Sequence, residues 1–193
     1  FAEEEGRTHA KLADLRGEVT LPEIYKYLMP QADEATRDEA IAHELGMEAR
    51  HAYGYAPVLD LMRDAKARGL KIMIVSDIYM NEPQLRAHVT HACGPEVVAL
   101  IDRFFVSSDY GTGKVEQLFT HVLAELGVSP SKILHVGDNP RADQDRPSQL
   151  GINTVHFVQF APDVVQRLRL EAVAATLIGR AGTRVDRPVY QPH

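Results

Sequence analysis

The sequence predicts an α/β fold, a Rossmann-like parallel sheet that follows a helical cap. Short apolar runs alternate with helix-forming segments from residue 70 onward, and this alternation is typical of right-handed βαβ units. Residues 1–68 favour helix and contain no good strand. A third observation is the apolar run 133–136, which ends abruptly in Gly137 and Asp138. Open α/β sheets bind ligands at such strand ends.

Composition limits the classes of function. The chain has 193 residues, a net charge of −6 and one cysteine. Nucleic-acid binders usually carry a basic face, so an acidic chain without a basic cluster argues against that class. A single cysteine cannot form an internal disulfide, which favours a reducing, cytoplasmic location. The chain begins with Phe1 and has no signal-peptide pattern, and we expect it to be a piece of a longer protein.

The helical block, residues 1–68, is predicted to be a cap. Thr20 and Glu23 have the spacing of a capping box at the start of a helix over 21–28. A polar helix with a thin apolar face follows over about 33–53. A further helix over 58–68 is stopped by Gly69.

The core is predicted over residues 69–160, and 161–193 form a C-terminal helix and tail. The predicted strands are 72–75, 104–106, 133–136 and 154–157. The predicted helices are 82–92, 115–126, 142–150 and, after the core, 163–178. The helix over 115–126 has the clearest apolar periodicity in the chain.

Three successive strand ends carry side chains that suit phosphoryl transfer. Ser76 follows the first strand, a glycine-rich turn leads from the second to Lys114, and Asp138 and Asp143 follow the third. A hydroxyl can bind a phosphoryl oxygen, an ammonium can neutralise its charge, and two carboxylates suit Mg²⁺. No single residue is specific, so the prediction rests on their order and spacing.

At these positions the chain resembles the haloacid dehalogenase-like superfamily of phosphohydrolases. Segment 72–77 is similar to its second motif, Lys114 to its third, and 136–139 with Asp143 to its fourth. Segments 76–80 and 107–111 also resemble a bacterial group associated with glycosyltransferases and surface polysaccharide. The block 1–68 lies where this superfamily inserts its C1 cap.

The resemblance implies a Mg²⁺-dependent phosphatase that works through an aspartyl-phosphate. It implies that Ser76, Asp77 and Lys114 bind the phosphoryl group of the substrate, and that Ser76 and Lys114 take part in catalysis. It assigns the metal to Asp138 and Asp143. The implied substrate is a small phosphorylated metabolite or sugar phosphate, with no nucleic acid or membrane as partner.

The chain departs from this family at its first motif. That motif is Asp-x-Asp after the first strand, and its first carboxylate is the nucleophile. The one Asp-x-Asp present, 143–145, has no strand directly before it, and Tyr79 stands two residues after Asp77. We therefore expect an upstream segment, another chain or a rearranged segment to supply the central strand. The alternative is a catalytically silent scaffold domain of a larger protein, and a receiver-like domain is a weaker option.

The histidines are predicted to be structural. His43 and His51 lack the spacing of a zinc helix and are expected on a solvated face. His135 lies inside the strand over 133–136 and is expected to be buried and neutral.

Overall fold

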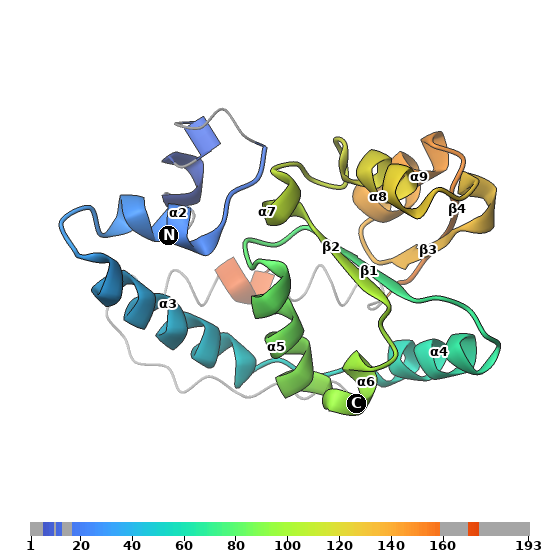
Figure 1. Cartoon of the computed structure of the whole chain (residues 1–193), viewed down its shortest axis with the longest axis horizontal. Coiled ribbons are helices and arrows are strands. Elements are labelled where there is room, and N and C mark those ends of the chain that lie inside the picture. Colours follow the sequence, from blue (N-terminus) through green and yellow to red (C-terminus); the bar gives the residue numbers. More distant parts are fainter. Residues whose placement is uncertain (1–5, 10, 13–16, 159–169, 174–193) are drawn as a thin grey trace.

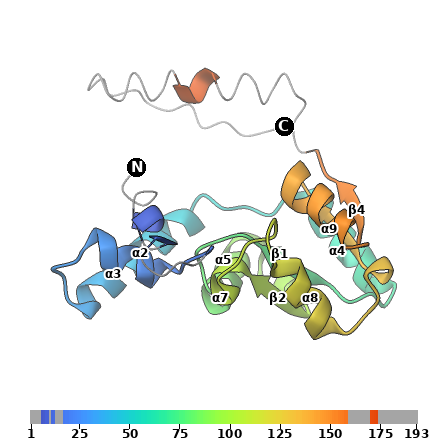
Figure 2. The ribbon, with the colours of Figure 1, turned by 90° about the horizontal axis from the view of Figure 1, so that it is seen from above.

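The computed structural model of the chain describes residues 6–9, 11–12, 17–158 and 170–173. Most of the predicted helix over 163–178, and the tail after it, lie outside these residues; 170–173 are helical. Residues 6–9 and 11–12 are helical, and the helices that follow are α2 (Leu21–Leu28), α3 (Glu34–Ala49) and α4 (Ala56–Ala67). Figure 2 shows α2 and α3 at one end of the described chain and β4 and α9 at the other, with β1, β2 and α5 between them.

Local capping explains where the first helices begin and end. The backbone N–H of Thr20 donates to the Glu23 carboxylate at 2.6 Å, as the capping box predicts. The Asp33 side chain accepts from the Thr36 N–H at 2.9 Å and starts α3. After α4, Gly69 has a φ of 76°, the left-handed conformation that ends many helices. No helix in the described ranges is long and apolar enough to cross a membrane.

The core begins at residue 73 and alternates strands with helices, as predicted. Its strands are β1 (Met73–Ser76), β2 (Arg103–Val106), β3 (Leu134–Gly137) and β4 (Asn153–His156). Its helices are α5 (Glu82–Cys93), α6 (Pro95–Val98), α7 (Ser107–Tyr110), α8 (Leu118–Leu126), the 3₁₀ turn η1 (Pro130–Lys132), the π-helix η2 (Pro140–Asp145) and α9 (Arg146–Gln149). The short helices α6 and α7 are absent from the sequence prediction.

Three predicted helix starts are wrong. The helix predicted over 58–68 begins at Ala56. The helix predicted from residue 115 begins at Leu118, because the Thr112 hydroxyl accepts from the Gln117 N–H at 3.3 Å and closes a turn over 112–117. The helix predicted over 142–150 begins at Pro140 and is divided into η2 and α9. It begins early because the Asn139 side chain accepts from the N–H groups of the next turn.

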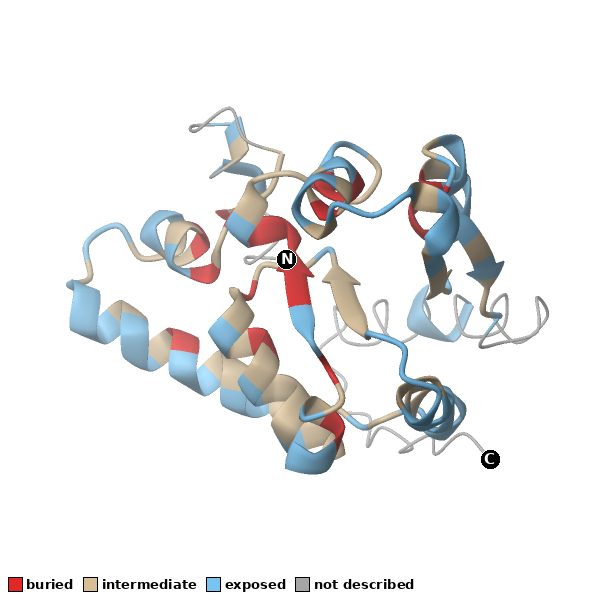
Figure 3. Ribbon diagram, turned by 45° about the vertical axis from the view of Figure 1, so that its right-hand side comes forward, coloured by how far each residue is buried: buried red, intermediate tan, exposed pale blue. Residues whose placement is uncertain are grey.

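The strands form two separate parallel pairs. β1 pairs with β2, and β3 pairs with β4, with Ser76 opposite Val106 and Gly137 opposite His156 at the carboxyl ends. In Figures 1 and 3, β1 and β3 are the strands of the two pairs that face each other. Within the described residues, the second edge of each of these two strands has no strand partner. The single sheet predicted from the sequence is therefore divided between β1 and β3.

The hydrophobic core surrounds β2, whose side chains alternate between two clusters. Phe104 and Val106 belong to a cluster with Met80, next to α5. Phe105 faces the other way and packs with Leu118 of α8. By contrast, the apolar side chains of β3 and β4 remain largely exposed, and Figure 3 shows this difference between the two strand pairs.

The N-terminal helical block, predicted to be a cap, is joined to the strand-containing part by main-chain contacts. The N–H of Glu18 donates to the carbonyl of Gly111 at 3.2 Å, and that of Leu21 donates to the carbonyl of Tyr79 at 3.1 Å. Helix α3 also packs on α5. These contacts hold the segment that leads into α2 against the loops that follow β1 and α7.

Replacement of Phe105 tests the position of the core. Because Phe105 is 0% exposed, we expect Phe105→Ala to lower the free energy of unfolding by about 3–5 kcal/mol. Leu70 is 56% exposed, so Leu70→Ala should change it by no more than about 0.5 kcal/mol. Urea denaturation measures both values, and equal losses would show that β2 is not the centre of the core.

Candidate functional site

The predicted site residues come from three loops at the carboxyl ends of the strands. Ser76 is the last residue of β1 and is followed by Asp77. Lys114 lies in the turn between α7 and α8. Asp138 and Asp143 follow β3. Parallel strands bring such loops to one edge of a sheet, which is why distant residues meet here.

Asp143 is the centre of this group of residues. Its side chain is almost fully buried, and its Oδ1 accepts from the Lys114 ammonium at 2.6 Å. His135 Nε2 lies 2.9 Å from the same oxygen. An ionised carboxylate can only accept, so the His135 tautomer that fits carries its proton on Nε2. The Asn139 N–H donates to Oδ2 at 3.0 Å, and the carboxylate thus joins three segments of chain.

Gly137 makes room for the Asp143 carboxylate. A Cβ built on Gly137 would lie 2.6 Å from the Asp143 Cβ and still closer to its carboxyl group. Real Cβ contacts are essentially never so short. Any side chain at position 137 would therefore collide with the Asp143 carboxylate, which packs directly on β3, so this position requires glycine.

The charge of Asp143 is stabilised by its partners. Burial disfavours the charged carboxylate, but hydrogen bonds from His135 and Lys114 outweigh this cost and hold the pKa of Asp143 well below its usual value. Asp143 is therefore an anion at neutral pH. The Lys114 side chain is itself only 13% exposed, so each charge compensates the burial of the other.

Asp77 is brought to the same group by the Lys114 main chain. Its Oδ1 accepts from the Lys114 N–H at 2.8 Å. Asp77 is partly exposed to solvent. The surrounding loops nevertheless remove enough water from its carboxyl group to raise its pKa. This effect is larger than the lowering of the pKa by the hydrogen bond from Lys114. Asp77 and Asp143 thus have pKa values shifted in opposite directions.

Within the described residues, no hydrogen bond or ion pair joins the side chains of Ser76 and Asp138 to this group. Ser76 is half-buried at the end of β1, and Asp138 is exposed after β3. The Asp138 carbonyl accepts from His156 Nε2 at 3.0 Å, which ties the loop to the end of β4. The roles predicted for these two side chains stay predictions.

His135 is a site residue that the sequence analysis assigned to the interior. It is half-buried rather than buried, and its ring packs edge-on against Phe119 at 4.9 Å. One signal in the sequence points to its place: residues two apart on a strand share a face. His135 and Gly137 are two apart, and the Asp143 carboxylate covers Gly137, so His135 faces the same carboxylate.

Two serine hydroxyl groups also bind the loop that carries Asp77, although the sequence analysis gave these serines no structural role. Ser107 is fully buried and accepts from the Ile78 N–H at 2.9 Å. The Ser108 hydroxyl donates to the Met80 carbonyl at 2.6 Å. These bonds fix the loop that carries Asp77 against the start of α7.

The described residues supply only part of a Mg²⁺ site. Mg²⁺ requires near-octahedral oxygen coordination, and no group of three His, Cys, Asp or Glu residues within the described chain is arranged to hold a metal. Both oxygens of Asp143 already accept hydrogen bonds. The Asp138 side chain is exposed, and its role as a metal ligand stays a prediction.

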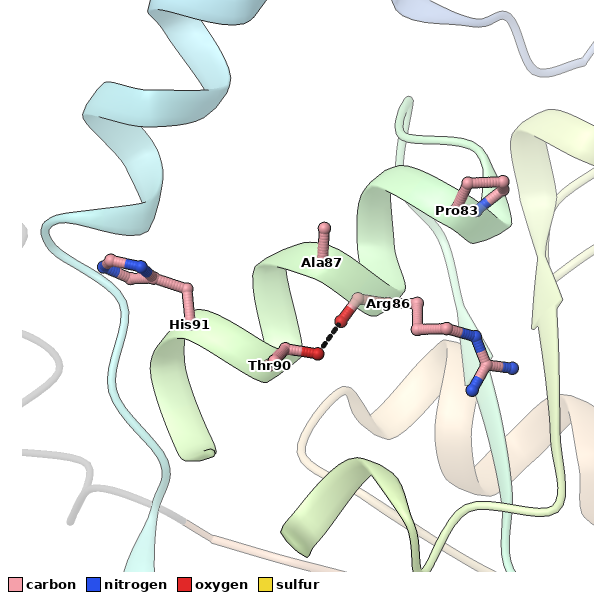
Figure 4. Close-up of a pocket in the computed structure, with 5 residues that line it drawn as sticks. All are labelled: Pro83, Arg86, Ala87, Thr90 and His91. Carbon is pink, nitrogen blue, oxygen red and sulfur yellow. Dashed lines mark hydrogen bonds between the residues drawn. The ribbon is translucent and has the colours of Figure 1, made fainter. Parts of the chain in front are cut away.

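A surface pocket of about 590 Å³ lies along α5, apart from this site. Figure 4 shows its lining residues, Pro83, Arg86, Ala87, Thr90 and His91. The Thr90 hydroxyl donates to the Arg86 carbonyl at 2.7 Å, and the Arg86 guanidinium stacks on Phe104. These polar groups are used within the protein, and the pocket shares no residue with the site around Asp143.

Comparisons with known proteins agree with this arrangement. Residues 3–143 match a family model described as haloacid dehalogenase-like hydrolase. The structure is similar to that of the L-2-haloacid dehalogenase from Xanthobacter autotrophicus with chloropropionic acid covalently bound, with a TM-score of 0.61 and 15% identity over 100% of this chain and 76% of that one. No curated protein sequence matches the chain.

Two further structures are similar. A candidate β-phosphoglucomutase from Thermotoga maritima has a TM-score of 0.51 and 12% identity over 85% of this chain and 82% of that one. A HAD phosphatase from Thermococcus onnurineus has a TM-score of 0.41 and 24% identity over 52% of this chain, which spans 43% of that protein. For the Xanthobacter and Thermotoga structures, at 15% and 12% identity, the likeness concerns the fold. The closer resemblance to a glycosyltransferase-associated group stays a prediction.

The opposite pKa shifts of the two carboxylates predict opposite mutational effects. Since the pKa of Asp143 is lowered in the folded chain, its charge stabilises the fold above about pH 3.9, the usual pKa of an unfolded Asp, and the effect is lost as the pH falls further. We expect Asp143→Asn to lower the free energy of unfolding at pH 7 and to have a smaller effect at pH 3, where part of the stabilisation by the charge is already lost, as measured by urea denaturation.

Asp77→Asn is the matched control. The raised pKa of Asp77 means that its charged form is disfavoured by folding, so this variant should lose no stability at pH 7. An Asp143→Asn defect of equal size at pH 3 and pH 7 would contradict the role of Asp143 as an ion-pair partner.

Proposed function

Because this chain belongs to the haloacid dehalogenase-like hydrolase family, we propose that it forms the phosphate site of a Mg²⁺-dependent phosphohydrolase. The observation that carries the proposal is the ion pair of Lys114 with the buried Asp143, 2.6 Å long. It fixes an ammonium at the edge of the strands, where a phosphoryl group can bind. Phosphate monoesters of small metabolites or sugars are the proposed substrates.

Each residue has a proposed role in this reaction. Lys114 neutralises charge on the phosphoryl group, while Ser76 and the loop of Asp77 bind its oxygens. Asp138 would hold Mg²⁺. Asp143 would orient a water molecule bound to Mg²⁺, or would ligate Mg²⁺ weakly through a remaining lone pair. When bound, Mg²⁺ would supply positive charge that stabilises the negative charge on the phosphoryl oxygens.

The attacking carboxylate must come from outside the sequence described above. No Asp-x-Asp follows a strand in this chain, and β1 and β3 each have an edge without a strand partner within the described residues. Unpaired backbone groups at the centre of a sheet are costly. We propose that an apolar strand ending in Asp-x-Asp, from another segment or another chain, pairs with both edges.

A catalytically silent domain is the second candidate. The absence of an Asp-x-Asp after a strand favours it, since the phosphate site then lacks its nucleophile. Such a domain would keep the fold and the ion pair as a structural element of a larger protein. The coding sequence that precedes Phe1 distinguishes the two candidates, since a strand ending in Asp-x-Asp there supports the enzyme.

Activity of the natural protein, including whatever precedes Phe1, tests the proposed reaction. We expect hydrolysis of p-nitrophenyl phosphate that requires Mg²⁺, and a loss in kcat/KM of roughly a hundredfold or more in Lys114→Met and in Asp138→Asn. Asp60→Asn is the control, because the Asp60 side chain is 73% exposed and, in the described part of the chain, pairs only with Arg63. Full activity of Asp138→Asn, or activity without Mg²⁺, would refute the proposal.

A peptide can test the proposed strand. A six-residue apolar, β-branched peptide that ends in Asp-x-Asp should raise the Tm of this chain, by the equivalent of about 2.7 kcal/mol at one hundred times its Kd. The same peptide with a central proline cannot complete the backbone hydrogen bonds and should have little effect. Equal effects of both peptides would rule out strand pairing between β1 and β3.

A further inference from the structure

A second pocket lies against the same two segments of chain as the ion pair of Lys114 and Asp143. Its volume is about 380 Å³. The lining residues come from the turn that follows Lys114 and from the helical segment over 140–149: Val115, Arg141, Asp145, Arg146 and Gln149. Val115 is the neighbour of Lys114 in sequence, and Asp143 lies between Arg141 and Asp145. The pocket is therefore adjacent to the proposed phosphate site.

The two arginines of this pocket have no acidic partner. No carboxylate of the described part of the chain lies within ion-pair distance of Arg141 or Arg146. Elsewhere in the described chain, several arginines pair with a carboxylate: Arg63, Arg68, Arg86 and Arg103. In a protein with a net charge of −6, this pocket thus brings together two guanidinium groups that lack acidic partners among the described residues. A pocket that holds them is suited to an external anion.

The Arg146 guanidinium is held in place before any ligand binds. Its Nε and Nη2 groups donate to the Glu116 carbonyl at 3.1 and 2.7 Å. A guanidinium has five N–H donors, so three remain for a ligand. Because the side chain is already ordered, less conformational entropy is lost when an anion binds. Arg141 is exposed and can turn toward the same ligand.

The chemistry of the pocket indicates the class of ligand. Guanidinium groups match the planar pair of oxygens of a carboxylate and the oxygens of a phosphate. The Gln149 amide adds another donor, whereas the single carboxylate of Asp145 leaves the pocket with a net positive charge. An apolar ligand would leave these groups unsatisfied.

We propose that this pocket binds the second anionic group, a carboxylate or phosphate, of a substrate whose phosphoryl group lies at Lys114. The assignment to a substrate rests on the proposed function. The same chemistry would bind a free inorganic anion instead, and the choice of probes below separates these two sources.

Calorimetric titration of the protein with two phosphonates tests the pocket. Methylphosphonate carries one anionic group, and 3-phosphonopropionate carries a carboxylate as well. We expect 3-phosphonopropionate to bind at least tenfold more tightly. Arg141→Met and Arg146→Met should each weaken its binding roughly tenfold to a hundredfold, since hydrogen bonds to charged groups have this strength, and should leave methylphosphonate binding unchanged.

Two variants serve as controls. Arg63→Met removes an exposed arginine of α4 and should change neither affinity. Lys114→Met should weaken both ligands. Since Arg146→Met also breaks the contact with Glu116, its Tm is measured alongside. Arg141→Met removes no contact within the described chain and remains a clean test if Arg146→Met is unstable.

The possible outcomes distinguish failure of the pocket proposal from failure of the proposed function. If the arginine variants weaken methylphosphonate as much as 3-phosphonopropionate, the pocket binds a free anion and the bifunctional substrate is refuted. If they behave like Arg63→Met while Lys114→Met weakens both ligands, the pocket proposal fails and the phosphate site stands. If they weaken 3-phosphonopropionate while Lys114→Met has no effect, the pocket stands and the phosphate site fails. No binding of either ligand refutes both.

Discussion

The buried carboxylate of Asp143 is the interaction on which this site depends. It accepts from Lys114, His135 and the Asn139 main chain, which belong to three separate segments. The ammonium and the carboxylate are both removed from water, and neither would be stable there alone. Loss of either partner would leave an uncompensated charge, so the turn before α8 and the loop after β3 are fixed to each other.

The same contact explains how the carboxyl ends of the two strand pairs are held near each other although the pairs do not form one sheet. Lys114 follows the β1–β2 pair in the chain, and Asp143 follows β3. Their ion pair joins the loops at the carboxyl ends, while the backbone between β1 and β3 has no strand partner within the described residues. Side-chain electrostatics thus hold the loops near one another where main-chain hydrogen bonds do not.

Positive charge in this acidic chain gathers around one short helical segment. Lys114 contacts the π-helix η2 through Asp143, and Arg141 and Arg146 line the pocket beside it. Asn139 shapes this segment, because its side chain accepts two N–H groups and starts the turn at Pro140. A single capping residue therefore starts the helical segment that carries one buried anion and two guanidinium groups without a carboxylate partner in the described chain.

The sequence by itself determined the features that depend on neighbouring residues. Capping at Thr20 and the stop at Gly69 follow from local hydrogen bonds and from φ preferences. The parallel pairing of the strands and the family resemblance at Lys114 and Asp138 are likewise carried by residue order, and the family match confirms the resemblance.

Only the tertiary structure decided which side chains meet. His135 became a partner of Asp143 because the carboxylate folds back over Gly137, a close approach that no local pattern encodes. The division between β1 and β3 and the pairing of Lys114 with Asp143 likewise join residues far apart in the chain. Such contacts depend on packing and on the shared burial of opposite charges, and these forces act through space rather than along the sequence.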